Sequence, residues 1–284
     1  MVALANDRYP ASLIRIPESL TNVFIAETST ARFHRFTRSS DGIVYGGSFY
    51  MSIGRQGSGK ESSGDKRTPL GVYFVTEQLD TSKLHAKYGV TAFPLDYPNA
   101  WDILAERDGD GIWVHGVDPQ GGQRPERDTD GCISLSNEDL MLLAPEFRDN
   151  VTPVLVAREV TWLDAAPDTA IRDELESRIA QWANSKASGN LHAYLSLYDS
   201  DFVRWGMDKA EWSSFSLQTT SLHNNRKVSF SDLLLLGYPE ETGLFLSRFR
   251  LTVIEDAREV TSTRRLYRRR GPNGVLKIIA EDVG

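Results

Sequence analysis

Cysteine is almost absent from this sequence, since Cys132 is the only one among 284 residues. A single cysteine excludes a disulfide within the chain and makes a cysteine-rich zinc site untenable. His34 and His85 lack metal-ligand spacing to His115. We therefore expect no metal site and no cofactor.

Long apolar runs and an excess of positive charge are also missing. No stretch approaches the ~20 apolar residues that span a bilayer, and residues 1–8 lack the basic start and apolar length of a secretory signal. The net charge of −7 argues against nucleic acid as the main partner. The chain is 40% hydrophobic and 25% charged, which is typical of globular proteins, and its length allows two domains.

The lone cysteine follows a histidine motif. Gly111-Ile-Trp-Val-His115-Gly116 precedes Thr129-Asp-Gly-Cys132-Ile-Ser-Leu. An imidazole beside a thiol favours the nucleophilic thiolate near neutral pH. The N–H groups of Gly131 and Cys132 are our candidate oxyanion donors. On this pair alone, a buried structural cysteine and histidine remain an equal alternative.

Two further blocks add specificity to this motif. They are Gly64-Asp-Lys66-Arg-Thr68-Pro69-Leu-Gly71-Val-Tyr73 and Ser136-Asn137-Glu138-Asp139-Leu140. Together with the histidine and cysteine motifs, they resemble the L,D-transpeptidase catalytic domain, a mainly β fold that modifies bacterial peptidoglycan. The resemblance covers roughly residues 11–160. It implies that Cys132 is the nucleophile and that His115 is the base, oriented by the backbone carbonyl of Gly116.

One position departs from the usual pattern of this family. An arginine commonly lies two residues after the cysteine, where this chain has Ser134. This difference and the segment Tyr97-Pro-Asn-Ala-Trp101-Asp resemble a particular branch of the family. That branch contains L,D-carboxypeptidases that set the shape of curved and helical bacteria, and relatives that attach or detach proteins at the same stem residue. The missing arginine favours hydrolysis over cross-linking.

Several residues around these motifs are candidates for substrate binding. They are Tyr97, Trp101, Arg124, Ser134 and Lys66. Each also has a structural interpretation, because turn residues shape a cleft wall and aromatic residues pack one. Asp130 would oppose thiolate formation unless it faces away or is paired. Arg124 and Arg127 in the loop before it are candidates to offset its charge or to bind a substrate carboxylate in place of the missing arginine, and a solvated loop is the favoured alternative.

The second half has a different pattern after a polar boundary near Pro167. Helical spacing over 171–182, a second helix over 191–198 and a third over 208–216 precede four strand-like runs, 228–236, 243–254, 260–269 and 275–280. This order resembles a nuclear-transport-factor-2-like (NTF2-like) α+β cone with a pocket. We expect a catalytic domain over 11–162 and this cone over 168–284. The arginine-rich run 264–270 is expected to form a solvated sheet face.

These patterns predict a periplasmic cysteine enzyme acting on peptidoglycan stem peptides. The L,D-carboxypeptidase reaction would cleave the bond between diaminopimelate and the terminal D-alanine through a thioester. The alternatives are an L,D-transpeptidase, which cross-links stems or attaches or detaches a protein, and a non-catalytic peptidoglycan-binding scaffold. The sequence leaves the oligomeric state open.

Overall fold

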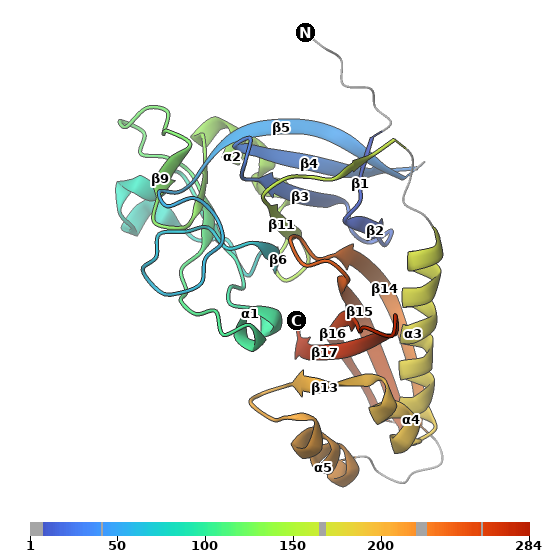
Figure 1. The fold of residues 1–284 in the computed structure, drawn as a ribbon. Coiled ribbons are helices and arrows are strands. Elements are labelled where there is room, and N and C mark those ends of the chain that lie inside the picture. Colours follow the sequence, from blue (N-terminus) through green and yellow to red (C-terminus); the bar gives the residue numbers. More distant parts are fainter. Residues whose placement is uncertain (1–7, 41, 165–168, 220–225, 257) are drawn as a thin grey trace. The chain divides into compact units, whose positions relative to one another are not determined.

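The computed structural model (Figure 1) describes residues 8–40, 42–164, 169–219, 226–256 and 258–284. The chain forms two compact units: unit 1 contains residues 1–10 and 18–165, and unit 2 contains 11–17 and 166–284. Segment 11–17, which we expected at the start of the catalytic domain, thus lies in unit 2. The expected boundary at Pro167 lies outside the described residues. None of the helices in the described ranges combines the length and apolar character needed to cross a membrane.

Unit 1 is built on strands, as the sequence predicts. Its nine-stranded sheet has the order β6 (Gly71–Phe74), β11 (Pro153–Ala157), β3 (Asn22–Glu27), β4 (Arg32–Ser39), β5 (Gly42–Gly54), β10 (Ile133–Leu135), β8 (Trp113–His115) and β7 (Ala92–Pro94), with β9 (Arg127–Thr129) on β5. A separate ribbon pairs β1 (Tyr9–Pro10) with β12 (Trp162–Leu163). The mainly β fold expected for the first half is confirmed.

Buried apolar side chains hold unit 1 together. Strand β3 lies between β4 and β11, and all of its residues are buried. Aromatic rings fill the core beside it: the centroids of Phe24 and Phe33 are 5.2 Å apart, and those of Phe93 and Phe147 are 4.5 Å apart. Removal of these rings from water is the main stabilising contribution expected for such a core.

Short helical segments complete unit 1. They are α1 (Ala100–Leu104), α2 (Asn137–Leu143) and the 3₁₀ turns η1 (Thr81–Lys83), η2 (Ala86–Tyr88) and η3 (Ala144–Glu146). The Asn99 side chain caps α1 and the Ser136 side chain caps α2 by accepting backbone N–H groups. The block Ser136–Leu140, which follows the cysteine motif, therefore contains the start of helix α2.

Strands β8 and β10 bring the histidine and cysteine motifs together. They run parallel, with Ile133 opposite Val114 and Ser134 opposite His115. His115 is the last residue of β8, and Cys132 directly precedes β10. Two motifs separated in sequence thereby come to neighbouring strands of one sheet.

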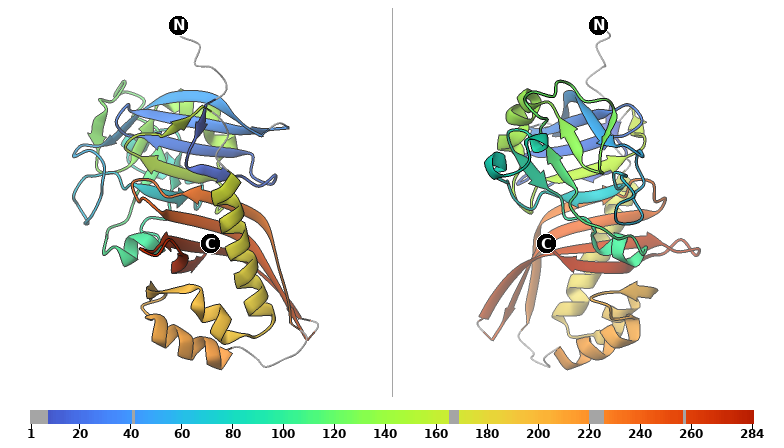
Figure 2. Two further views of the ribbon diagram at one scale, coloured as in Figure 1. Left: turned by 45° about the vertical axis from the view of Figure 1, so that its right-hand side comes forward. Right: turned by 90° about the vertical axis from the view of Figure 1, so that its left-hand side faces the viewer.

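Unit 2 is an α+β domain, as expected. Its six-stranded sheet has the order β13 (Tyr198–Val203), β17 (Leu276–Val283), β16 (Arg258–Arg270), β15 (Leu244–Glu255), β14 (Lys227–Gly237) and β2 (Leu13–Arg15). The helices are α3 (Thr169–Ala187), α4 (Leu191–Ser196) and α5 (Lys209–Thr219). Helix α3 packs against β14 and β2, and Figure 2 shows it crossing the curved sheet.

Two details of unit 2 differ from the sequence-based expectations. The helix expected over 191–198 ends at Ser196, because Tyr198 begins β13 and pairs with β17. The arginine-rich run is not a uniformly solvated face: Arg268 is 1% exposed and Arg265 is 4% exposed. Strand β16 lies between β15 and β17, and Arg268 donates a hydrogen bond to Ser247 Oγ at 2.9 Å.

Candidate active site

His115 is buried and held by the backbone of its neighbour. Its Nδ1 lies 2.6 Å from the carbonyl oxygen of Gly116, which can only accept a hydrogen bond. Nδ1 therefore carries the proton in the neutral ring, and the lone pair is on Nε2. Burial lowers the pKa of His115 to about 4, and the positive charges of Arg124 and Lys87 act in the same direction. At neutral pH the ring is an uncharged base.

Burial favours the protonated form of the Cys132 thiol. Burial raises its pKa, which the nearby charges of Lys87 and Arg124 and a hydrogen bond from the Trp113 backbone oppose. Its Sγ donates to the carbonyl oxygen of Gly111 at 3.3 Å. These pKa directions oppose the thiolate that the neighbouring imidazole suggested from sequence, because burial favours the neutral form of both groups.

The residue before the cysteine has to be small. Gly131 has φ of +127°, and a Cβ atom there would lie 2.8 Å from the carbonyl oxygen of Arg67. Its N–H donates to Thr129 Oγ1 at 3.1 Å, while Thr129 Oγ1 donates to the carbonyl oxygen of Cys132 at 2.7 Å. Of the two predicted oxyanion donors, the Gly131 N–H would therefore have to exchange a partner.

Ser134 acts on the histidine rather than facing outward. Its side chain is 2% exposed, and its hydroxyl donates to the carbonyl oxygen of Gly116 at 2.9 Å. The same oxygen accepts the hydrogen bond from His115 Nδ1. Ser134 thus donates to the same carbonyl oxygen that accepts from the imidazole, and its contribution to substrate binding stays a prediction.

Ser134→Ala is expected to lower kcat roughly fivefold without changing KM, because one neutral hydrogen bond contributes about 1 kcal/mol. Ser52 is a matched control: it lies opposite Ser134 across β5 and β10, is buried, and its hydroxyl has no hydrogen-bond partner within the described structure. Ser52→Ala should leave kcat unchanged. Steady-state kinetics on a soluble stem peptide measure both variants, and an equal loss in the two would remove this role from Ser134.

Asn137 fixes the loop after the histidine. Its Oδ1 accepts the N–H of Val117 at 3.0 Å and that of Val90 at 3.3 Å, and its Nδ2 donates to the Val117 carbonyl at 2.8 Å. A side chain at Gly116 would collide with Asn137 Oδ1. Asn137, the first residue of α2, therefore fixes the loop that follows the histidine strand β8.

Asp130 is paired, though not with the partners expected from sequence. Its carboxylate lies 3.1 Å from Arg55 Nη2 and 3.9 Å from Lys87 Nζ. Arg124 lies 3.8 Å from Asp128 instead. The position of Arg55 at the end of β5 explains the difference, because residues far apart in sequence meet here.

The other candidate substrate-binding residues are less directly connected to the pair. Tyr97 is buried, and its hydroxyl donates to the Asp108 carbonyl at 2.9 Å, a structural role in this geometry. Trp101 lies in the first turn of α1, and its backbone N–H donates to the cap Asn99. Lys66 is exposed in a loop with φ of +58°. Their contribution to substrate binding stays a prediction.

Sequence reasoning missed Lys87 and Tyr88 of η2. The Tyr88 ring meets the His115 ring edge-on, with centroids 5.2 Å apart, and the Tyr88 carbonyl accepts the Gly116 N–H at 3.1 Å. Neither residue lies in a recognisable motif, and only the folded loop brings them to the site. Within the described ranges, no three His, Cys, Asp or Glu side chains gather closely enough to hold a metal ion.

Family models match both units. Residues 23–156 match the L,D-transpeptidase catalytic domain. Unit 1 belongs to that family. Residues 174–282 match the Cds6 C-terminal NTF2-like domain. Both resemblances seen in the sequence are confirmed, one for each unit of the chain.

Solved structures share this two-domain fold with the L,D-transpeptidase-family chain. Bd1075 of Bdellovibrio bacteriovorus has a TM-score of 0.78 at 23% identity, with 98% of both chains covered. The helical cell shape determining protein Pgp2 of Campylobacter jejuni has a TM-score of 0.78 at 23% identity, with 95% of both chains covered. No curated protein matches the chain.

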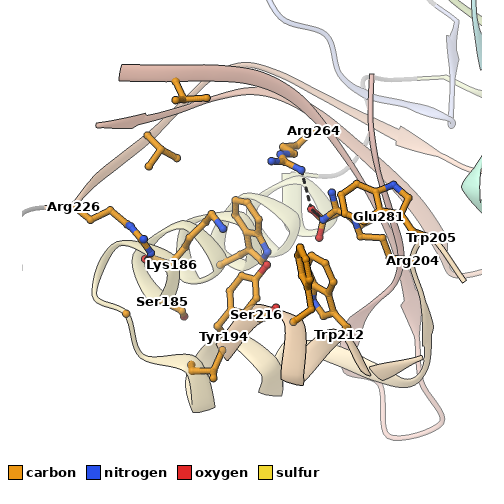
Figure 3. Close-up of a pocket in the computed structure, with 16 residues that line it drawn as sticks. Ser185, Lys186, Tyr194, Arg204, Trp205, Trp212, Ser216, Arg226, Arg264 and Glu281 are labelled. Carbon is orange, nitrogen blue, oxygen red and sulfur yellow. Dashed lines mark hydrogen bonds and ion pairs between the residues drawn. The ribbon is translucent and has the colours of Figure 1, made fainter. Parts of the chain in front are cut away.

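The NTF2-like unit contains a cavity of about 390 Å³ (Figure 3). Its walls include the aromatic residues Trp182, Tyr194, Trp205, Trp212 and Phe215, the cations Lys186, Arg204, Arg226 and Arg264, and one carboxylate, Glu281. Burial lowers the pKa of Lys186, although the Glu281 charge opposes this. Glu281 accepts from Arg204 at 2.6 Å and lies 3.5 Å from Arg264. The cavity is therefore suited to a ligand with negative charge and apolar faces.

Proposed function

We propose that the protein is a periplasmic L,D-carboxypeptidase that removes the terminal D-alanine from tetrapeptide stems of peptidoglycan. The observation that carries this proposal is the Ser134–Gly116–His115 arrangement beside Cys132. In this arrangement the proton of His115 is on Nδ1, so the lone pair of Nε2 is free to act as the base. Ser134, which stands where the family commonly has arginine, donates to the carbonyl that orients the imidazole.

The geometry supports a thioester mechanism. As Cys132 Sγ attacks the diaminopimelate carbonyl carbon, its proton passes to His115 Nε2 and the carbonyl oxygen becomes an oxyanion. The backbone N–H of Cys132 is our candidate donor to that oxyanion. Collapse of this intermediate breaks the C–N bond, and His115 returns the proton to the departing D-alanine amine. Water, activated by His115, then releases the tripeptide and regenerates the thiol.

Transpeptidation shares the first half of this reaction and differs in the second nucleophile. Incubation with purified muropeptides followed by mass spectrometry separates the two outcomes. Loss of one D-alanine from tetrapeptides would support hydrolysis, whereas joined stems would replace the proposal by L,D-transpeptidation. Unchanged muropeptides alongside retained binding would favour the scaffold alternative.

We further propose that the cavity of unit 2 holds the enzyme on its polymer. Peptidoglycan combines carboxylates with apolar sugar faces, and the cavity offers cations together with tryptophan rings. In particular, Lys186 Nζ lies 5.4 Å from the centre of the Tyr194 ring and 5.7 Å from the Trp182 ring.

Lys186→Gln is expected to lower the rate on intact sacculi about tenfold and the rate on soluble muropeptides less than about twofold, because a charge-assisted contact contributes about 1.5 kcal/mol or more. Lys227→Gln is the control, since Lys227 is exposed at the start of β14 in the same unit. Release of soluble product from sacculi and turnover of a muropeptide measure the two activities. Equal losses on both substrates would contradict a role in polymer binding alone.

A further inference from the structure

Two cations from separate loops meet beside the catalytic pair. Lys87 lies in η2, and Arg124 lies in the loop between β8 and β9. Arg124 Nη2 donates to the Lys87 carbonyl oxygen at 3.1 Å, which ties the loops together. The Arg124 carbonyl in turn accepts the Tyr50 hydroxyl at 2.9 Å. The guanidinium, whose side chain is 17% exposed, is therefore held in place rather than left free in solvent.

Both cations are close to the reacting groups. Lys87 Nζ lies 5.0 Å from the centre of the Tyr88 ring, which packs edge-on against His115. It also lies 3.9 Å from the carboxylate of Asp130, two residues before Cys132. The charges of Lys87 and Arg124 act in the same direction on both titratable groups: they lower the pKa of the Cys132 thiol and that of His115.

The acidic groups in this cluster do not use up its positive charge. Asp130 is shared between Lys87 and Arg55, and Asp128 is 3.8 Å from Arg124. The single carboxylate of Asp130 thus serves two cations, Lys87 and Arg55, and does not neutralise both of them. A cation whose charge is only partly neutralised attracts an anionic group of the substrate.

We propose that Lys87 and Arg124 form an anion subsite beside Cys132 that binds the free C-terminal carboxylate of the substrate. The inference rests on the proposed function and deepens it: the enzyme removes only the last residue of a stem, because that residue alone offers a carboxylate one residue beyond the scissile carbonyl. A stem continued by a further residue, or ending in an amide, places a neutral group against the cations.

A pair of peptides tests this subsite. The wild-type protein should cleave a tetrapeptide stem with a free terminal carboxylate at least about tenfold faster, in kcat/KM, than the same stem ending in a carboxamide. Lys87→Gln and Arg124→Gln should each lower the rate on the acid about tenfold more than the rate on the amide, since both substrates also lose the effect of that charge on the Cys132 thiol. Lys83→Gln, an exposed lysine in the neighbouring turn η1, should change neither rate. Equal losses on acid and amide would overturn the subsite, since they would indicate an effect on the thiol alone.

Alkylation of Cys132 gives a readout that does not depend on turnover. Iodoacetate carries a carboxylate and iodoacetamide is neutral, so the subsite should raise the ratio of their rate constants above that of free cysteine. Both glutamine variants should lower this ratio several-fold, and Lys83→Gln should keep it. If the wild-type protein cleaves no stem peptide, the proposed function fails while this ratio still decides the subsite. A ratio unchanged in both variants overturns it.

Discussion

Cys132→Ala is expected to lower turnover of soluble muropeptides by at least about 10³-fold while the protein remains folded. In the proposed mechanism the thiol forms the bond to the acyl group, and Cys132 is the only cysteine in the chain, so no second thiol can replace it. The substitution removes one sulfur from a half-buried position and leaves Gly131 and the β10 pairing unchanged. Product release, followed by mass spectrometry, measures the loss.

Cys132→Ser distinguishes the covalent role from a packing role. A hydroxyl nearly preserves the volume and polarity of the side chain but is a far weaker nucleophile beside this neutral base, so the serine variant should be nearly as inactive. Thermal unfolding should show midpoints close to that of the unmodified protein for both variants. Appreciable turnover by the alanine variant would refute the assignment of the nucleophile.

His115→Gln is expected to lower kcat/KM by about 10² to 10⁴-fold, because general base catalysis typically contributes that much. Glutamine retains an N–H that can donate to the Gly116 carbonyl, but it has no basic nitrogen. His192→Gln is the control, since His192 is exposed on α4 in unit 2. Retention of most activity by the His115 variant would exclude the imidazole as the base.

The pH profile of the unmodified protein tests the charge of this histidine. Because the pKa of His115 is lowered to about 4, the base stays neutral as the pH falls through 6.5, the ordinary pKa of histidine. The acid limb of kcat/KM should therefore lie near pH 4. Burial raises the pKa of Cys132, so alkylation should accelerate as the pH rises above neutrality. An acid limb near pH 6.5 would indicate an imidazole exposed to water during the reaction.

The sequence predicted the elements whose residues share a local pattern. Strands β14 to β17 appear in the sequence as four separate strand-like runs. The Gly131–Cys132 and His115–Gly116 pairs were recognisable because each requires particular residues in consecutive positions. These local constraints identified the first unit as an L,D-transpeptidase-type domain.

Features set by long-range contacts were not predictable. Arg268 is buried within unit 2, where its guanidinium donates to Ser247 Oγ, and nothing in a run of arginines indicates that burial. Strand β13 exists because Tyr198 pairs with Ile278, which lies 80 residues later. Lys87 likewise reaches Asp130 only after η2 and the loop before β10 have folded together.

The short strand β2 constrains how the chain can be divided. Residues 13–15 lie near the N-terminus, yet they form the edge of the sheet in unit 2 by pairing with β14. A break anywhere between residues 165 and 168 would therefore leave two polypeptides that still share a hydrogen-bonded sheet, anchored further by the ion pair of Arg15 with Glu176. Because segment 11–17 belongs to unit 2, exchange of either unit between related proteins would have to transfer these seven residues together with residues 166–284.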